Sequence, residues 1–159
     1  MADALPPAAR RIADLLAAEG MKDRVVEMPD STRSAADAAR ACGCAVAQIA
    51  KSIVLRATRS DRPVVVVASG ANRVDEARIA AVLGEPVGKA DADFVRARTG
   101  FAIGGVAPLG FSESVPLFID ADLLQHAEIW AAAGTPRCVF RLTPDELIRL
   151  TGGTVTPIV

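Results

Sequence analysis

The chain has 159 residues, of which 51% are hydrophobic and 23% charged, and its formal net charge is −1. This composition excludes a disordered chain, and the length suffices to bury a core without disulfide or metal staples. The near-neutral charge argues against a grip on a long nucleic-acid backbone, so DNA is not an expected partner. Aromatic residues make up only 4%, which argues against a stacking platform for single strands.

No apolar run reaches the roughly 18–20 residues that span a bilayer. The N-terminus carries Asp3 and lacks the basic and apolar blocks of a secretory signal. We therefore expect a cytoplasmic protein with no membrane partner. The chain has three cysteines and one histidine, His126, at spacings that do not suit zinc, so we expect neither a metal nor a cofactor.

Helical and strand-like patterns alternate along the chain. Spacing and end signals predict helices over 7–20, 34–41, 75–83, 91–98 and 143–151, with single turns at 45–49 and 120–124. Strands are predicted over 25–28, 52–57, 64–69, 115–119, 128–132, 138–142 and 155–159. The continuous apolar run 64–67 indicates a strand covered on both faces. Together the elements predict an α+β (mixed α/β) fold, a single domain over 1–159 with a mixed sheet and peripheral helices.

Familiar catalytic motifs are missing from the sequence. There is no nucleophile elbow, no P-loop and no dinucleotide-binding glycine motif. Asp120 and Asp122 could form a carboxylate pair, but helix capping explains them equally well. A redox pair of Cys42 and Cys44 is a weak alternative, because a loop this short strains a disulfide.

Three features could carry chemistry. Lys51 stands at the entry to an apolar strand, where it is either a surface lysine or a fixed cation aimed at a phosphate or carbonyl oxygen. The segment 100–110 has four glycines and one proline, so it is either a tight turn or a loop that presents backbone N–H groups to a ligand. Thr135, in the turn 133–136, is either a turn residue or a polar group at a pocket rim.

Taken together, these features resemble the YbaK/EbsC family, in its ProX-type branch, which is related to the editing domain of bacterial prolyl-tRNA synthetase. The most specific segments are Ala50-Lys51-Ser52 and the loop 100–110, and the likeness extends over most of the chain. The resemblance implies a mixed α/β domain around a curved β-sheet. The implied activity is hydrolysis of the ester that joins a wrong amino acid to tRNA.

The family's functional positions imply roles for several residues. Lys51 matches the essential lysine, which would bind the terminal phosphate or polarise the ester carbonyl. Thr135 stands where several relatives carry His, and the region around Cys138 lacks the Asp of the cysteine-editing branch. The expected substrate-binding residues are Gly104, Gly105, Val106, Pro108, Gly134 and Thr135.

The implied partner is the acceptor end of aminoacyl-tRNA, with tRNA for proline and prolyl-tRNA synthetase as the expected tRNA and synthetase. The expected order of removed amino acids is alanine, then serine or threonine, then cysteine. Two other functions stay open at this point: a tRNA-end or nucleotide-binding module without turnover, and an interaction domain that docks on a synthetase.

Overall fold

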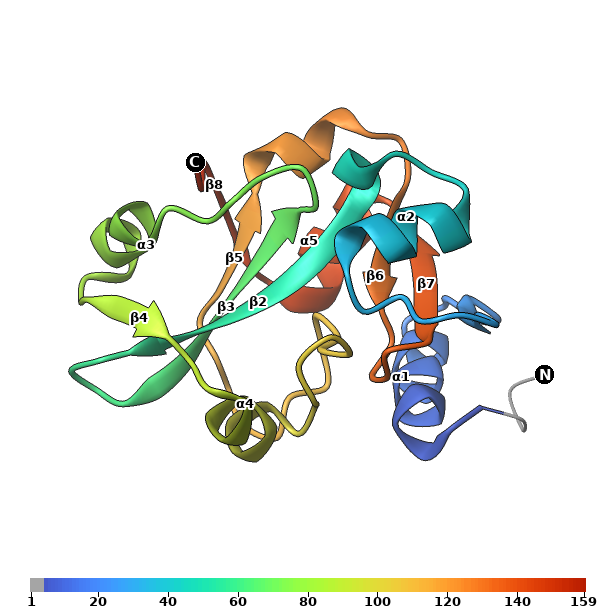
Figure 1. Ribbon diagram of the computed structural model, residues 1–159, viewed down its shortest axis with the longest axis horizontal. Helices are drawn as coiled ribbons and strands as arrows, with labels where there is room; N and C mark the ends of the chain where they lie inside the picture. The colour runs from blue at the N-terminus through green and yellow to red at the C-terminus, as the bar shows by residue number, and fades with distance from the viewer. Residues whose placement is uncertain (1–4) are drawn as a thin grey trace.

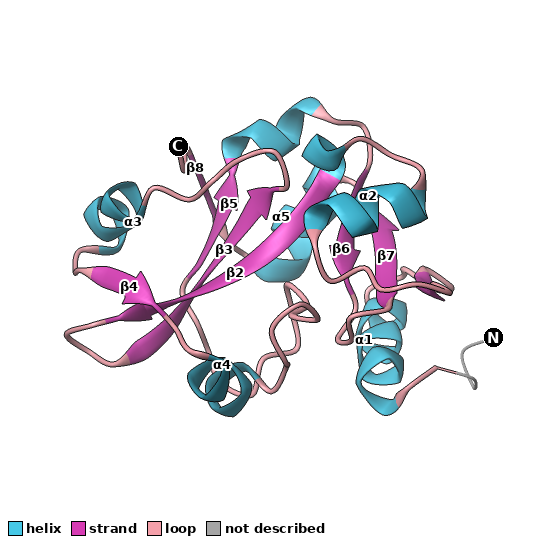
Figure 2. Cartoon of the chain, viewed as in Figure 1, coloured by secondary structure: helices cyan, strands magenta, loops and turns pink. Residues whose placement is uncertain are grey.

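The computed structural model describes residues 5–159, and Figures 1 and 2 show a twisted sheet with helices around it. Segment 1–4, at which no signal peptide is expected, lies outside the described residues. The helices are α1 (Pro7–Ala18), α2 (Ala35–Cys42), α3 (Glu76–Leu83), α4 (Ala92–Thr99) and α5 (Pro144–Thr151), with 3-10 helices η2 (Val46–Gln48) and η3 (Ala121–Gln125). The strands are β1 (Val25–Glu27), β2 (Ile49–Ala57), β3 (Arg62–Ser69), β4 (Val87–Lys89), β5 (Leu117–Asp120), β6 (Ile129–Ala132), β7 (Cys138–Leu142) and β8 (Thr154–Thr156).

The strands form one mixed sheet in the order β1-β7-β6-β2-β3-β5-β8, and β4 also pairs with β2. The pairs β1/β7, β6/β7, β2/β3 and β2/β4 are antiparallel, whereas β2/β6, β3/β5 and β5/β8 are parallel. The predicted fold class, a mixed α/β fold with peripheral helices, is confirmed. Among residues 5–159, no helix is long and apolar enough to cross a membrane.

Strand β3 lies inside the sheet, between β2 and β5, and is covered on both faces, as its apolar run predicts. Val65 and Val67 belong to the larger core cluster, and Val64 and Val66 to a second cluster on the opposite face. All four side chains are fully buried. This alternation follows from the two-residue period of a strand and fixes the register of the sheet against both layers.

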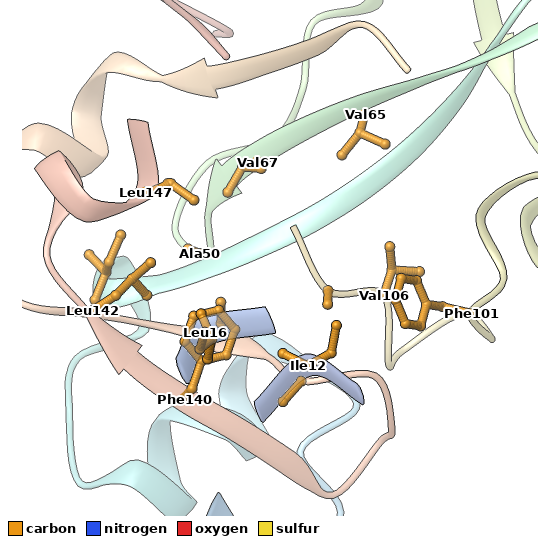
Figure 3. Packing of buried hydrophobic residues seen from close by; sticks show 14 of the residues in the cluster. Ile12, Leu16, Ala50, Val65, Val67, Phe101, Val106, Phe140, Leu142 and Leu147 are labelled. Atoms are coloured by element: carbon orange, nitrogen blue, oxygen red, sulfur yellow. The ribbon is translucent and has the colours of Figure 1, made fainter. Parts of the chain in front are cut away.

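Helix α1 packs on the larger core cluster with α4 and α5. Figure 3 shows Ile12 and Leu16 of α1 close to Phe140 of β7, and these side chains are fully buried. Ala9 completes the buried face one turn earlier, whereas Leu15, which we expected on that face, is 37% exposed. Helix α3 instead contributes Ile79 to the second cluster.

Two differences from the predicted elements matter for the site. Strand β4 was not predicted, because Val87-Gly88-Lys89 follows a proline and is too short to show an alternating pattern. Strand β2 begins at Ile49 rather than at 52, so Lys51 is its third residue and not a residue at its entry. Strand β4 and the first two residues of β2 both take part in pairing along the edge of β2 that faces away from β3.

The carboxylate of Glu146 links the start of α5 to the loop before β1. It accepts two hydrogen bonds from the Arg24 guanidinium, each 3.0 Å long, and its Oε1 accepts a third from the Thr143 backbone N–H. The predicted capping box of Thr143 and Glu146 is therefore confirmed. Arg24 lowers the pKa of Glu146 to about 2.

This contact predicts a specific loss of stability in acid. Because the folded-state pKa is depressed from 4.5 to about 2, the contribution is present above pH 4.5 and disappears as the pH falls to about 2. Glu146→Gln should lower the free energy of unfolding at pH 7 by up to about 3 kcal/mol and flatten its fall over that window. Urea unfolding at several pH values measures both effects.

The matched control is Glu128→Gln. Its ion pair with Arg141 is about half exposed on both sides, so its removal should change stability by less than about 1 kcal/mol. Equal acid dependence in Glu146→Gln and the parent protein would contradict the assignment.

Candidate functional site

The outer edge of β2 is only partly paired. Strand β6 pairs with Ile49 and Ala50, and β4 pairs with 55–57, so residues 51–54 have no registered partner on that edge. Figure 1 shows β4 and β6 near opposite ends of the long strand β2. An unpaired strand edge inside a fold presents backbone donors and acceptors, which a ligand can use.

The register identifies which backbone groups face the gap. The Gly70 N–H donates to the Ile49 carbonyl across the β2/β3 pair, at 2.7 Å. In an antiparallel ladder, alternate residues bond to the same neighbour, so the odd-numbered residues of β2 face β3. The N–H and C=O groups of Ser52 and Val54 consequently point toward the unpaired edge.

A cavity of about 340 Å³ opens against this edge. Its wall is mostly apolar, and its polar side chains are those of Thr32, Arg33, Lys51 and Ser52. No carboxylate or imidazole is among the described lining residues. The apolar wall consists of Ala35, Ala38, Ile49, Ala50, Ile53, Val54, Ala90, Val95, Ile103, Val106, Trp130, Ala131, Ala132 and Val139.

Lys51 and Ser52 are consecutive residues of β2 beside the unpaired edge, and their side chains point to opposite faces of the sheet. Lys51 is half-buried and makes no ion pair or side-chain hydrogen bond within residues 5–159. The Ser52 hydroxyl oxygen is the one buried side-chain N or O atom, among those residues, that lacks a hydrogen-bond partner. A buried hydroxyl without a partner is destabilising, which makes Ser52 a residue to test beside Lys51.

Three loops meet beside the cavity. The Thr32 N–H and hydroxyl both donate to the Pro136 carbonyl, at 2.7 and 2.9 Å. A Cβ built on Gly105 would lie 2.8–2.9 Å from backbone atoms of Thr135, so the loop 100–110 touches the turn 133–136. A Cβ on Gly104 would overlap the Arg33 side chain. These contacts hold Arg33 and Gly104 together at the cavity wall.

The structure brings some of the expected site residues to the cavity and places others behind it. Lys51, Gly104 and Val106 line the cavity. Gly105 is buried, and its N–H donates to the Ala102 carbonyl at 3.0 Å rather than facing a ligand. The close approach of two loops accounts for a glycine at this position, and a direct contact of Gly105 with substrate stays a prediction.

The remaining three expected residues do not line the cavity. Pro108 is buried and lies two residues after Val106, which lines the cavity. Gly134 has φ +94° and packs against the Ala8 backbone. The Thr135 hydroxyl accepts hydrogen bonds from the N–H groups of Arg137 and Cys138, at 3.3 and 3.1 Å. Gly134 and Thr135 shape the turn that Gly105 touches, and a direct contact of any of the three with substrate stays a prediction.

The sequence analysis did not single out Ser52, Thr32, Arg33 or Trp130 as site residues. Ser52 was quoted only as part of Ala50-Lys51-Ser52, and no pattern marked it as a site residue, because successive side chains of a strand point to opposite faces of the sheet. No pattern in the sequence marks Thr32 or Arg33, because they reach the cavity through contacts with loops about 70–100 residues away.

Other candidate groups have structural roles. Asp120 is buried, and its carboxylate accepts from the Ser69 and Asp122 N–H groups and from the Asn72 amide, which confirms capping. Burial raises the pKa of Cys42 to about 11, so its thiol is not a nucleophile at neutral pH. Among residues 5–159, no group of three or more His, Cys, Asp or Glu side chains could hold a metal ion.

The contact between the two loops predicts the effect of Gly105→Ala. The added methyl group would meet backbone atoms, which cannot move aside as a flexible side chain can. We expect a loss of about 1–3 kcal/mol in the free energy of unfolding, measured by urea titration. Gly88→Ala is the control, because its Cβ would lie 3.6 Å from Thr58 in ordinary contact. Equal stability of the two variants would contradict the close approach.

Comparison with known proteins identifies the family. The family described as "Aminoacyl-tRNA editing domain" matches residues 29–150. The chain is 28% identical over 123 residues to "Uncharacterized protein YwhH" of Bacillus subtilis, covering 77% of this chain and 78% of that protein. It is 27% identical over 121 residues to "Putative Cys-tRNA(Pro)/Cys-tRNA(Cys) deacylase EbsC" of Enterococcus faecalis, covering 76% and 73%.

The fold agrees with this match. A solved structure described as "a putative trans-editing enzyme for prolyl tRNA synthetase" superposes with a TM-score of 0.90 at 44% identity, covering 98% of both chains. The family match spans the unpaired edge of β2, the loop 100–110 and the turn 133–136, which are the elements that build or support the cavity. The chain therefore belongs to the aminoacyl-tRNA editing domain family, and its activity is that of an aminoacyl-tRNA deacylase.

Proposed function

We propose that this deacylase acts in trans on mischarged tRNA for proline and removes a small non-cognate amino acid, with alanine preferred. The observation that carries the proposal is the apolar cavity on the unpaired edge of β2, which holds Lys51 beside a wall of small and branched aliphatic side chains. The prolyl-tRNA synthetase named for the similar structure supports the choice of tRNA. That synthetase is then the source of the mischarged tRNA.

The chemistry of the wall favours a small aliphatic side chain. Ala50, Ala131 and Ala132 offer no hydrogen bond from their side chains, and the Thr32 hydroxyl already donates to Pro136. A serine or threonine hydroxyl would have to replace its hydration by a bond to the unpaired edge of β2 or to Lys51 or Arg33, whereas an alanine methyl group needs no such partner. Cysteine is less polar than serine, but the sequence around Cys138 lacks the Asp implied for cysteine editing, so cysteine stays last in the order.

Lys51 supplies the electrostatic part of the reaction. As water adds to the ester carbonyl carbon, negative charge develops on the carbonyl oxygen, and the Lys51 ammonium stabilises that charge or the neighbouring terminal phosphate. The N–H groups of Ser52 and Val54 on the same edge can donate to the bound substrate. The bond from the carbonyl carbon to the ribose oxygen then breaks, and free amino acid and tRNA leave.

The proton of the attacking water needs an acceptor other than a protein carboxylate. No Asp, Glu or His is among the described residues that line the cavity. The substrate has its own basic group, the α-amine, and a ribose hydroxyl next to the ester. We therefore assign proton transfer to the substrate or to bulk water, and the leaving ribose oxygen takes up one proton.

A deacylation screen tests the substrate. Alanyl-, seryl-, threonyl-, cysteinyl- and prolyl-tRNA for proline are compared at equal enzyme concentration, with alanyl-tRNA for alanine as the test of tRNA choice. We expect the fastest release from alanyl-tRNA for proline and protection of prolyl-tRNA. Faster hydrolysis of the cysteinyl ester would overturn the order, and equal hydrolysis of both alanyl-tRNAs would overturn the choice of tRNA.

The role of Lys51 predicts a selective loss of activity in Lys51→Ala. Loss of one group that stabilises the transition state costs about 2.7–4 kcal/mol, or roughly 10²–10³-fold in rate. The fold should persist, because this side chain has no partner that its removal would leave unpaired. Single-turnover deacylation and thermal unfolding measure the two effects. Lys22→Ala, an exposed lysine outside the cavity, is the matched control and should keep full activity.

For Ser52→Ala we expect stability to rise while activity falls, unlike Lys51→Ala, in which the fold should persist and activity should fall. Ser52→Ala removes a buried hydroxyl without a partner, so the Tm should rise, by about 2–4 °C for each kcal/mol of desolvation relieved. If the hydroxyl binds the substrate, kcat/KM should fall. A lower Tm would show that the hydroxyl has a structural partner, and an unchanged kcat/KM would remove Ser52 from the site.

A further inference from the structure

A second hollow, of about 480 Å³, continues from the cavity along β2. The two hollows share Lys51, Ile53, Val54 and Ala90 in their walls. Beyond these shared residues, the second hollow is bordered by segment 72–76 after β3 and by Lys89 of β4. The two hollows therefore adjoin at Lys51, where a bound substrate would lie next to both.

The second hollow collects positive charge that the fold leaves unpaired. Lys51, Arg73 and Lys89 line it, and none of them makes an ion pair or side-chain hydrogen bond within residues 5–159. Glu76 is the single carboxylate of the lining, so the hollow has an excess of cations. Six arginines elsewhere in the described chain are instead paired with carboxylates: Arg24, Arg40, Arg56, Arg62, Arg98 and Arg141.

The segment that carries Arg73 is held in place on both sides. The Asn72 amide donates to the carboxylates of Asp120 and Asp122, at 2.9 and 2.7 Å. On the other side, the Asp75 N–H donates to the Ile158 carbonyl at 2.6 Å. Arg73 therefore projects from an anchored backbone, which lowers the entropy lost when its side chain binds an anion.

We propose that this second hollow, the Arg73–Lys89 groove, binds the phosphodiester backbone of the acceptor strand that leads to the aminoacyl end of tRNA. The inference rests on the proposed function, since it takes the aminoacyl group to occupy the cavity at Lys51. A row of unpaired cations that begins at the reacting end is complementary to a chain of phosphates, and it gives no means of reading base identity. It supplies affinity for RNA from a chain whose net charge is −1.

The test is a double variant, Arg73→Gln with Lys89→Gln, which leaves Lys51 in place. Binding of uncharged tRNA for proline is titrated by fluorescence anisotropy at several salt concentrations, so the result does not depend on turnover. We expect Kd to rise at least tenfold at low salt, and the slope of log K against log salt to become shallower by about 0.7 for each cation lost. Thermal unfolding should be unchanged.

Two further variants sharpen the test. Arg78→Gln is the matched control, because Arg78 is exposed on the neighbouring helix α3 and lines neither hollow. It should leave Kd and the salt slope as in the parent protein. Glu76→Gln removes the carboxylate of the groove and should tighten binding, the reverse of the double variant.

A comparison of two substrates distinguishes an effect on the groove from an effect on the reacting site. Deacylation of alanyl-tRNA for proline should fall in the double variant, whereas hydrolysis of 3′-O-alanyl-adenosine, which has no phosphate, should keep the parent rate. Unchanged tRNA affinity and salt slope would overturn the proposal, and so would equal losses on both substrates. Failure of the parent protein to hydrolyse any aminoacyl-tRNA would refute the proposed function instead, while the binding titration would still decide the role of the groove.

Discussion

The site depends on one constraint: β4 and β6 both pair with the outer edge of β2, and together they do not cover it. Strand β2 has nine residues. On its outer edge, two of them pair with β6 at one end and three pair with β4 at the other. The four residues between them keep their position because the antiparallel pairing with β3 spans the whole strand. The same arrangement opens a cavity and places Lys51 and Ser52 on its wall. Loss of a sheet partner over four residues is destabilising unless water or a ligand satisfies the backbone groups.

The arrangement of charge follows a similar logic. Six arginines of residues 5–159 form ion pairs with carboxylates, such as Arg98 with Glu113. The cations that line the two hollows have no carboxylate partner, so no neighbouring side chain neutralises their charge. A protein with little net charge can thus attract a polyanion locally, because screening limits the reach of distant charges to about 10 Å. The net charge alone argues against binding along an extended nucleic acid, but it is compatible with binding of a short terminal segment.

Much of the fold could be predicted from local patterns. The apolar run 64–67 indicates the central strand, and the capping box at Thr143 marks the start of α5. Lys51 could be singled out because it interrupts an apolar strand. Strand β4 could not be predicted, since three residues show no period and its pairing with β2 is set by contacts about 30 residues apart. The positions of Thr32 and Arg33 at the cavity could not be predicted either, because they depend on contacts between loops far apart in the sequence.

The glycine-rich loop shows that one motif can serve close packing of loops as well as ligand binding. Four glycines in 100–110 indicate that the backbone approaches something closely, and a ligand is one such object. In the structure, Gly105 approaches the backbone of Thr135, while Gly104 needs its positive φ to place the loop beside Arg33. Gly105 therefore supports the cavity wall from behind, whereas Gly104 lies in the wall itself, next to Arg33. A loop of this kind confers specificity through the shape of the wall it supports, so its sequence can constrain substrate size even where its own N–H groups are used within the turn.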